Sequence, residues 1–454
     1  MPPQMGWQGI VALIVFAAAI LLIAVDAIDL TLAVIVGAGI LIASGVTTLR
    51  SAVGYVAEAH ETIALFFGGM VLVRAFAPTG IFEWMGVRIC QLSRGSGKRM
   101  LFLILIAIAP FAAVLPNAII VILLAPVVIR IAENFETDFV PLLFLLVFFA
   151  NSSGLLTLVG DPASFVVGDA INIGFLGFLR IVTPGAVLAI LAIVALVPWL
   201  FRALWKLDHK GQRQLELPQI RAPFLVPAGA VIVVLEVGFF MFGDMLTVPL
   251  YPAAVALLGS VLALAIVHAS GLDSVEAILR DVDWTTLIFF GCVFVMVGAM
   301  ADHGVLAYAA LAMTNLFGHN LALASLSMLF GLGAVSTVVP NIPMAVAMVP
   351  LLKGYAVNIG LATPAMISAN YKGEFPAATI PLFLAMMFAA TLGGNATMIG
   401  SSSNLIAIGI SAQHGRRIRF VEFAKYGIWV TIVQLVVSAG YIGLRFLLPA
   451  AIHH

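Results

Sequence analysis

Two stretches of this chain combine glycine, proline and small polar residues inside long apolar runs, at residues 151–162 and 393–404. Glycine and proline at this density interrupt a helix, and the freed backbone amides and carbonyls can bind a solute or an ion. Their side chains add hydroxyls and amides. We therefore expect these stretches to contribute substrate-binding residues, namely Ser152, Ser153, Thr157, Asn395, Thr397, Ser401 and Ser402.

Two Pro–Asn pairs supply further amides. Asn117 follows Pro116, and Asn341 follows Pro340, each between two short apolar segments. An asparagine amide offers one acceptor and two donors, enough to hold a small oxyacid or to join a cation's ligand shell. We expect Asn117 and Asn341 to complete a four-part polar site with the two interrupted stretches.

Two carboxylates lie within apolar segments. Asp161 is the one carboxylate in either interrupted stretch, and the aligned residue of the second stretch is Ser401. Glu236 lies in the middle of an apolar run. An ionisable group at membrane depth is costly and marks an ion path by default, so we expect Asp161 and Glu236 to couple transport to an ion, such as a proton. The alternatives are helix capping by Asp161 and a satisfied interior carboxylate at Glu236.

The composition places the chain in a bilayer. Hydrophobic residues make up 63% and charged residues 9%, against about one quarter charged in soluble domains. Spanning segments must satisfy their own backbone groups, so the expected class is an all-α polytopic membrane protein. The net charge is zero and gives no reason to expect a nucleic-acid partner. The two cysteines, Cys90 and Cys292, have no disulfide or metal-ligand spacing, and we expect no metal or cofactor.

Apolar runs predict five full spans in each half of the chain. They lie near residues 9–25, 28–43, 61–79, 139–168 and 181–201, and near 224–242, 247–268, 285–302, 376–411 and 426–449. The arms around the two Pro–Asn pairs rise only about 20–22 Å, less than a hydrocarbon core of about 30 Å. Residues 100–131 and 321–352 are therefore expected to form re-entrant helical hairpins.

The same motifs recur in the same order, which predicts two inverted repeats. LFFG at residues 65–68 returns as IFFG at 288–291, and both hairpins and both breaks follow. Five crossings per repeat give the halves opposite orientations. We expect repeats at residues 1–202 and 224–454, each with a broken helix (139–168 and 376–411), joined by a cytoplasmic linker at 203–223. This orientation puts most Lys and Arg inside, and both termini outside, the cytoplasmic membrane.

Paired helix breaks and hairpins indicate a secondary transporter that binds its solute at the repeat interface. An enzyme would need a base near a nucleophile, and no histidine is expected at the depth of Ser153 or Ser402. A simple channel would not need two hairpins opening to opposite sides. The expected partners are the lipid bilayer and a small inorganic oxyacid or cation.

Two further stretches resemble a known superfamily. Residues 283–291 (DWTTLIFFG) and 392–427 resemble the ion-transporter superfamily of the ArsB arsenite exporters, the NhaD sodium/proton antiporters, the melanosomal P protein and the dicarboxylate/citrate carriers. The similarity is greatest to the ArsB and P-protein branch. It implies hairpins and broken helices, alternating access by an elevator-like or rocking motion, and commonly a homodimer. The hairpin tips lack the Ser–Asn–Thr hydroxyls of the dicarboxylate carriers.

The resemblance leads to a specific hypothesis, the export of arsenite or antimonite in exchange for protons. Undissociated arsenite is a small neutral trihydroxy acid, which suits amides and hydroxyls without a fixed cation. No Lys or Arg lies in the two interrupted stretches or next to the two Pro–Asn pairs. Sodium/proton antiport of the NhaD type and sodium-coupled dicarboxylate transport remain alternatives. An arsenical ATPase subunit is a further partner that the sequence leaves open.

Overall fold

The computed structural model describes residues 5–25, 27–112, 115–208, 216–367, 371 and 373–448. All regular structure in these residues is helical, and no β-strand is present there. Part of the expected linker (209–215) and part of the first hairpin (113–114) lie outside the described residues. The expected all-α class is confirmed, because a chain this apolar bonds its backbone groups within its own helices.

Eight helices in the described part of the chain are long and apolar enough to cross a membrane, or up to ten if each of two bent pairs is one span. This makes the chain a multi-pass membrane protein. The eight are α1 (Trp7–Ala24), α4 (His60–Phe76), α7 (Asn117–Asn134), α11 (Thr183–Leu200), α13 (Leu225–Phe242), α14 (Pro252–Ser270), α16 (Trp284–Asp302) and α22 (Phe420–Ile442). The bent pairs are α9 (Pro162–Ala170) with α10 (Phe175–Ile181) and α17 (Val305–Phe317) with α18 (Leu321–Val335).

Shorter helices complete the fold. In the first half they are α2 (Leu30–Ala43), α3 (Leu49–Glu58), α5 (Ile81–Ser93), α6 (Gly97–Ala112), α8 (Val140–Ser153), the 3-10 turn η2 (Gly154–Leu156) and α12 (Arg202–Trp205). In the second half they are α15 (Val275–Arg280), α19 (Asn341–Asn358), α20 (Ile380–Gly393) and α21 (Ser402–Gln413). The helices α5 and α17 are additions to the expected spans, and each packs against the second arm of a hairpin, α7 or α19.

The hairpin arms are longer than the hydropathy pattern predicts. The first pair is α6 with α7, which ends at Asn134 rather than near residue 131, and the second is α18 with α19, which ends at Asn358 rather than near 352. Polar residues such as Arg130 and Lys353 end an apolar run, but the helical backbone continues through them. With 18 residues, α7 rises about 27 Å, so its length no longer excludes a full crossing.

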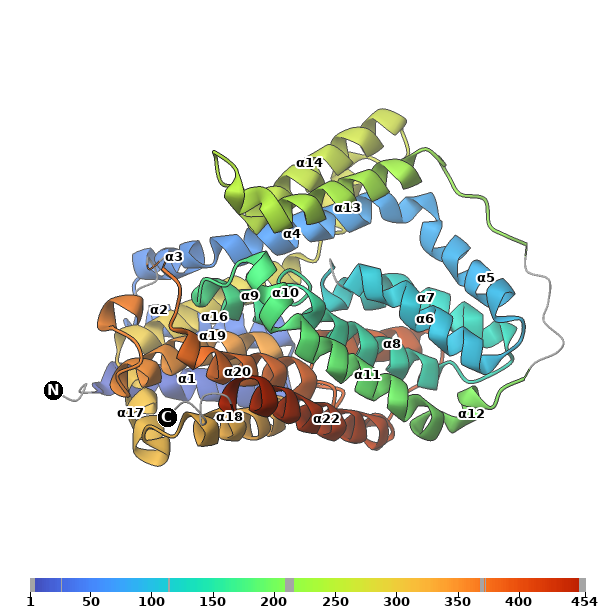
Figure 1. Cartoon of the computed structure of the whole chain (residues 1–454). Helices are drawn as coiled ribbons and strands as arrows, with labels where there is room; N and C mark the ends of the chain where they lie inside the picture. Colours follow the sequence, from blue (N-terminus) through green and yellow to red (C-terminus); the bar gives the residue numbers. More distant parts are fainter. Residues whose placement is uncertain are drawn as a thin grey trace.

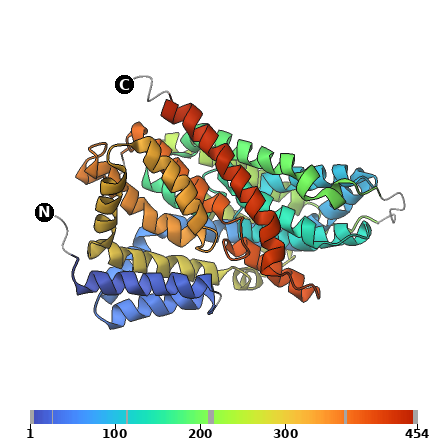
Figure 2. The ribbon, with the colours of Figure 1, turned by 90° about the horizontal axis from the view of Figure 1, so that it is seen from below.

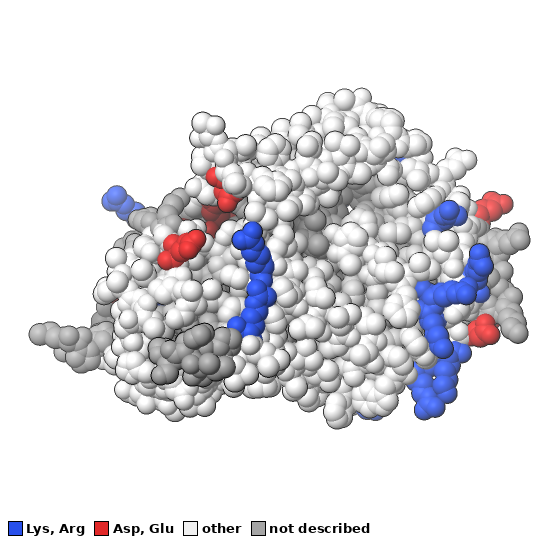
Figure 3. All heavy atoms as spheres, viewed as in Figure 1, with Lys and Arg blue, Asp and Glu red and all other residues white. Residues whose placement is uncertain are grey.

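The two halves pack against each other over long helices. Helix α4 of the first half lies along α14 of the second, and α16 of the second half lies along α2 of the first. Figures 1 and 2 show these helices running side by side between two ends of the molecule. The start of α1 and the last turn of α22 lie at one end, and α12 lies at the other. Lys and Arg side chains gather on the visible face at the α12 end (Figure 3).

Two short helices, α8 and α20, form the centre. Nearly every residue of each is buried, including Leu145 and Phe388 at 0% exposure. A helix that is apolar on all sides is stable when protein surrounds it on all sides. Helices α6, α7 and α22 pack on α8, and α18, α19 and α22 pack on α20. Both central helices end at the glycine-rich breaks, so the breaks lie deep inside the protein.

Candidate functional site

The first break places Asp161 at the start of a helix. The chain leaves α8 through η2, turns, and enters α9 with Asp161 as the N-cap residue and Pro162 in the first turn. Proline fits this position because its missing N–H would have no helical partner there. The Asp161 carboxylate accepts hydrogen bonds from the backbone N–H of Ser164 at 3.1 Å and from its hydroxyl at 3.2 Å. The capping role weighed for Asp161 is therefore present in the structure.

The same carboxylate also joins both hairpin tips. The amide nitrogen of Asn117, the first residue of α7, donates to Asp161 Oδ1 at 3.3 Å, and that of Asn341, the first residue of α19, donates to the same oxygen at 3.1 Å. From the central helix α20, the hydroxyl of Thr391 donates to Oδ2 at 3.1 Å. Four parts of the chain thus meet at one side chain, which is fully buried.

All five groups of the described residues that donate to Asp161 are electrically neutral. The positive potential comes instead from helix ends, because α7, α9 and α19 all begin at this point. A helix N-terminus acts like about half a positive charge, so three of them supply about +1.5 charges. Such an arrangement can hold one anionic group, and here it holds the chain's own carboxylate.

Two of the buried polar atoms that have no hydrogen-bond partner in the described structure are Oδ1 of Asn117, which belongs to this cluster, and the hydroxyl of Ser153, the last residue of α8. Asn117 Oδ1 lies close to the backbone of Gly154, where an added Cβ would come within 2.7 Å of it. The free oxygen of Asn117 and the Asp161 carboxylate together form a small set of oxygen groups. They could bind a proton, a cation or the hydroxyls of a neutral solute.

A second polar cluster joins the two breaks to each other. Asn151 of α8 donates to Oδ1 of Asn395 at 2.9 Å and to Oδ1 of Asn404 at 3.0 Å. Its own Oδ1 accepts from the hydroxyls of Ser403 and Ser401 at 2.5 Å and 3.4 Å. We call this group, with Ser152 and Gln434, the Asn151 network.

The remaining hydrogen bonds of this network connect it to Gln434 of α22. Gln434 donates to the Ser152 hydroxyl at 2.8 Å, and Asn395 donates to Gln434 at 3.0 Å and to Ser152 at 3.2 Å. Saturated networks of this kind fix the relative positions of the helices that carry them. Ser152 and Asn395, expected to bind substrate, therefore bond to each other, and Ser401, expected likewise, bonds to Asn151.

The other residues expected to bind substrate, Thr157, Thr397 and Ser402, lie at different points of the two breaks. Thr397 donates its hydroxyl to the backbone carbonyl of Thr337 in the second hairpin. Thr157 lies half-buried in the first break, and Ser402 is the half-buried first residue of α21. Sequence reasoning missed Thr391, Asn151 and Gln434 as members of the clusters. Each is a polar residue in a buried apolar helix, which is itself a signal of a functional or interhelical contact.

The two breaks have matching geometry. A Cβ added to Gly160 would lie 2.7 Å from the Gly154 carbonyl oxygen, and one added to Gly400 would lie 2.6 Å from that of Gly394. The Cβ added to Gly160 would also lie 2.8 Å from the carbonyl oxygen of Ala112, which ends α6. The Cβ added to Gly400 would lie 2.9 Å from the carbonyl oxygen of Ser336, which follows α18. Only glycine fits at such close approaches. Each break is therefore held against the first arm of its own hairpin.

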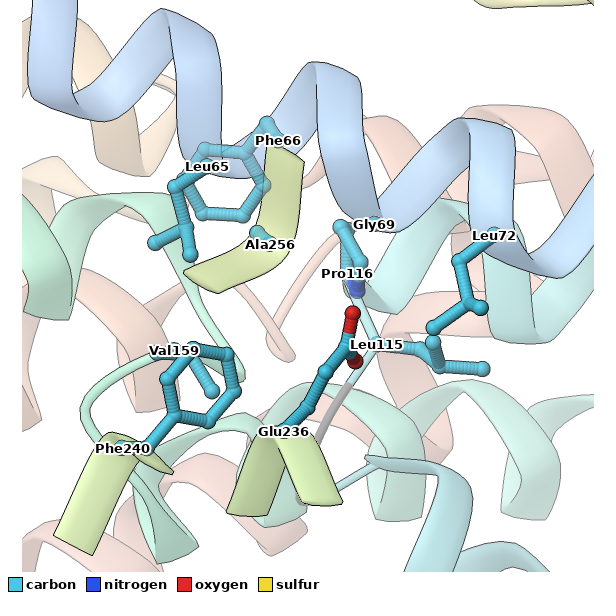
Figure 4. Close-up of a pocket in the computed structure, with 10 residues that line it drawn as sticks. All are labelled: Leu65, Phe66, Gly69, Leu72, Leu115, Pro116, Val159, Glu236, Phe240 and Ala256. Atoms are coloured by element: carbon cyan, nitrogen blue, oxygen red, sulfur yellow. The ribbon is translucent and has the colours of Figure 1, made fainter. Parts of the chain in front are cut away.

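Glu236 lies apart from both clusters. It is on α13 and lines a small cavity formed with α4, α14 and the tip of the first hairpin (Figure 4). Its carboxylate has no hydrogen bond in the described structure. The two expected coupling carboxylates thus occupy different places, Asp161 at the meeting point of the tips and Glu236 at the contact between α13 and one tip.

Comparison with known proteins identifies relatives over nearly the whole chain. The CitMHS family model, described as citrate transporter, matches residues 20–371. An uncharacterized transporter of Synechocystis sp. is 50% identical over 428 residues, 94% of this chain and 95% of its own length. An uncharacterized transporter of Mycobacterium tuberculosis is 31% identical over 450 residues, 97% of this chain and 99% of its own.

The human P protein is 27% identical over 520 residues, which cover 96% of this chain and 60% of that protein. Among solved structures, the crystal structure of the Alcanivorax borkumensis YdaH transporter aligns with a TM-score of 0.58, 12% identity and 87% coverage of both chains. At this identity the match shows a similar fold.

Proposed function

Since the chain belongs to the CitMHS citrate transporter family, we propose that it is a secondary active transporter that exchanges a small neutral oxyacid, such as arsenite or antimonite, for protons. The family and these relatives are described as transporters. The observation that carries the proposal is the convergence of both hairpin tips on the Asp161 carboxylate.

This geometry supplies a reason for exchange. Undissociated arsenite is a donor of three hydroxyl hydrogens, and the ionised Asp161 carboxylate is an acceptor. A proton on Asp161 removes the same acceptor that the solute hydroxyls use. Proton and neutral oxyacid therefore compete for one carboxylate, and competition at a site that faces the two sides in turn produces antiport. The neutral donors around Asp161 fit an uncharged solute because no Lys or Arg of the described structure bonds there.

A second candidate follows from the three helix N-termini and from the family description. With Asp161 protonated, the tip amides and the helix ends are available to a carboxylate from solution. A carboxylate such as citrate would then enter together with a proton, as symport rather than antiport. Sodium/proton antiport is a third outcome, with the Asn117 oxygen beside Asp161 as an ion ligand.

Proton movement in proteoliposomes separates these outcomes. A pH-sensitive dye is sealed inside vesicles at equal pH on both sides, and arsenite, antimonite, sodium or citrate is added outside. Arsenite/proton exchange raises the internal pH on arsenite addition, whereas citrate symport lowers it on citrate addition. A rise with sodium alone supports sodium/proton exchange. The proposal is refuted if arsenite and antimonite leave the internal pH at the level of protein-free vesicles.

The matched variant is Asp161→Asn, which keeps an oxygen to cap α9 and cannot exchange a proton. We expect it to fold and to lose solute-dependent proton movement. Ser325→Ala, on α18, serves as a control because its buried hydroxyl makes no hydrogen bond in the described structure. Full proton exchange by Asp161→Asn would remove this residue from the coupling step.

The proposed orientation has two inverted repeats, at residues 1–202 and 224–454, with the linker at 203–223 in the cytoplasm and both termini outside the cytoplasmic membrane. The gathering of Lys and Arg at the α12 end supports it (Figure 3). So do the matched glycine contacts of the two breaks. Asp161 and all its donors belong to one chain, so neither a homodimer nor an arsenical ATPase subunit is needed to complete the site.

A further inference from the structure

A cavity separates the first hairpin tip from the helices behind it. Phe66 and Gly69 of α4, Phe240 of α13, Pro116 of the tip and Val159 of the first break line it. The Glu236 carboxylate points from α13 toward Pro116 and α4 (Figure 4). The free space of the cavity suits about one water molecule.

The carboxylate of Glu236 is buried without a partner. The residue is 5% exposed, and Oε1 has no hydrogen-bond donor in the described structure. The position of the Glu236 carboxylate depends on Gly259 of α14, because a Cβ added to this glycine would lie 1.6 Å from Oε1 of Glu236. An unpaired buried charge is among the most costly groups in a protein interior. A chain would gain stability by replacing Glu236 with an apolar residue, unless the carboxyl group has a function.

The lining of the cavity indicates which ligand it can take. Sodium, magnesium and calcium need several oxygen ligands, and Glu236 is the one lining residue with a polar side chain. No other titratable or charged side chain of α4, α13, α14, the tip or the first break lines the cavity in the described structure. A proton needs a single oxygen. The Asp161 site differs in this respect because it combines several oxygen groups.

We propose that Glu236 is a second proton-binding site, separate from Asp161, which carries its proton while the first hairpin tip rests against α4 and α13. An ionised carboxylate facing Pro116, Val159 and Phe240 would be unpaired in an apolar cavity, whereas the neutral acid can stay there. When the tip moves away, water reaches the carboxyl group and the proton leaves. This step rests on the alternating movement in the proposed function, but proton binding itself does not require any particular solute.

Infrared difference spectroscopy of the purified protein in lipid nanodiscs tests proton binding directly. A protonated carboxylic acid has a C=O stretching band that shifts in D₂O and disappears on deprotonation. We expect such a band in the wild type, its loss in Glu236→Gln, and its persistence in Asp161→Asn. Sodium, added as the chloride salt, should leave it unchanged. The proposal is overturned if Glu236→Gln retains every such band, or if sodium removes the Glu236 band.

A glycine pair supplies a second test that leaves the carboxyl group in the protein. Gly259→Ala must displace the Glu236 carboxylate, whereas Gly238→Ala, on α13, adds a methyl group with no atom within 4 Å. We expect the first to shift the frequency of the Glu236 band and the second to leave it unchanged. Equal spectra for the two variants would contradict the proposed place of the proton.

Transport measurements separate this inference from the proposed function. In proteoliposomes, Glu236→Gln should retain solute binding, and the pH profile of its transport should lack one titration that the wild type shows. An unaltered pH profile would overturn the coupling role of Glu236. If no tested solute moves protons but the infrared band still depends on Glu236, the proposed function fails while the proton site stands.

Discussion

Asn151 connects the two breaks, and its replacement by alanine should destabilise the protein. The Asn151 amide is the hydrogen-bond donor to Oδ1 of Asn395 and to Oδ1 of Asn404. Asn151→Ala leaves both buried oxygens without a donor. The hydroxyls of Ser401 and Ser403 lose an acceptor but keep the bond between them, at 2.8 Å. The expected cost therefore comes mainly from two orphaned amide oxygens.

An orphaned buried acceptor costs about 1–3 kcal/mol, so two cost about 2–6 kcal/mol. Hydrogen bonds between membrane helices average about 0.6 kcal/mol, which places the expected loss near the lower limit, at about 2 kcal/mol. The matched control is Ser153→Ala, two residues further along the same helix. Ser153 is equally buried, but its hydroxyl has no hydrogen-bond partner in the described structure, so its removal should be neutral or stabilising.

Thermal unfolding of the detergent-solubilised variants, followed by tryptophan fluorescence, measures the difference. A loss of about 2 kcal/mol lowers the melting temperature by several degrees. We expect this for Asn151→Ala, with Ser153→Ala at or above the wild type. Equal melting temperatures for Asn151→Ala and the wild type would refute the view that this network holds the breaks in place.

Three further predictions concern the breaks and the surface. Gly160→Ala should prevent normal folding, because its Cβ would lie 2.7–2.8 Å from two backbone oxygens, whereas Gly409→Ala, with no atom within 4 Å, should express like the wild type. Arg74 bonds two aspartates, at 3.2 Å and 2.7 Å, so Arg74→Gln should lower the melting temperature modestly, and more at low than at high salt. Burial and the neighbouring Asp302 carboxylate raise the pKa of Tyr55 to about 12. The folded protein then holds this proton more tightly than the unfolded chain, so stability should fall as the pH rises from about 10 to about 12, and Tyr55→Phe should remove that part of the loss in an alkaline unfolding series.

The sequence predicted the parts of the site better than the contacts between them. Pro–Asn pairs and glycine-rich breaks are local signals, because each marks a point where a helix must end. They place Asn117, Asn341 and Asp161 at helix starts, where the structure has them. The hydropathy pattern also predicted the central helices, although it ended the hairpin arms too early at polar residues such as Lys353.

Contacts between distant segments required the structure. Ser152 and Asn395 belong to different breaks, and no local pattern indicates that they bond to each other and to Gln434. Thr391 looks like an ordinary helix residue until α20 brings its hydroxyl to Asp161. Such pairings depend on how the helices pack, which periodicity alone does not specify.

The two breaks differ in one respect that matters for ion coupling. Asp161 caps α9, whereas Ser401, at the same place in the second break, makes no capping bond to α21 and donates its hydroxyl to Asn151 instead. A single acid can be bonded by both tips at once. The two breaks thus share their backbone contacts but differ in their side chains: the first places a titratable group where both hairpin tips meet, and the second places a hydroxyl in the Asn151 network.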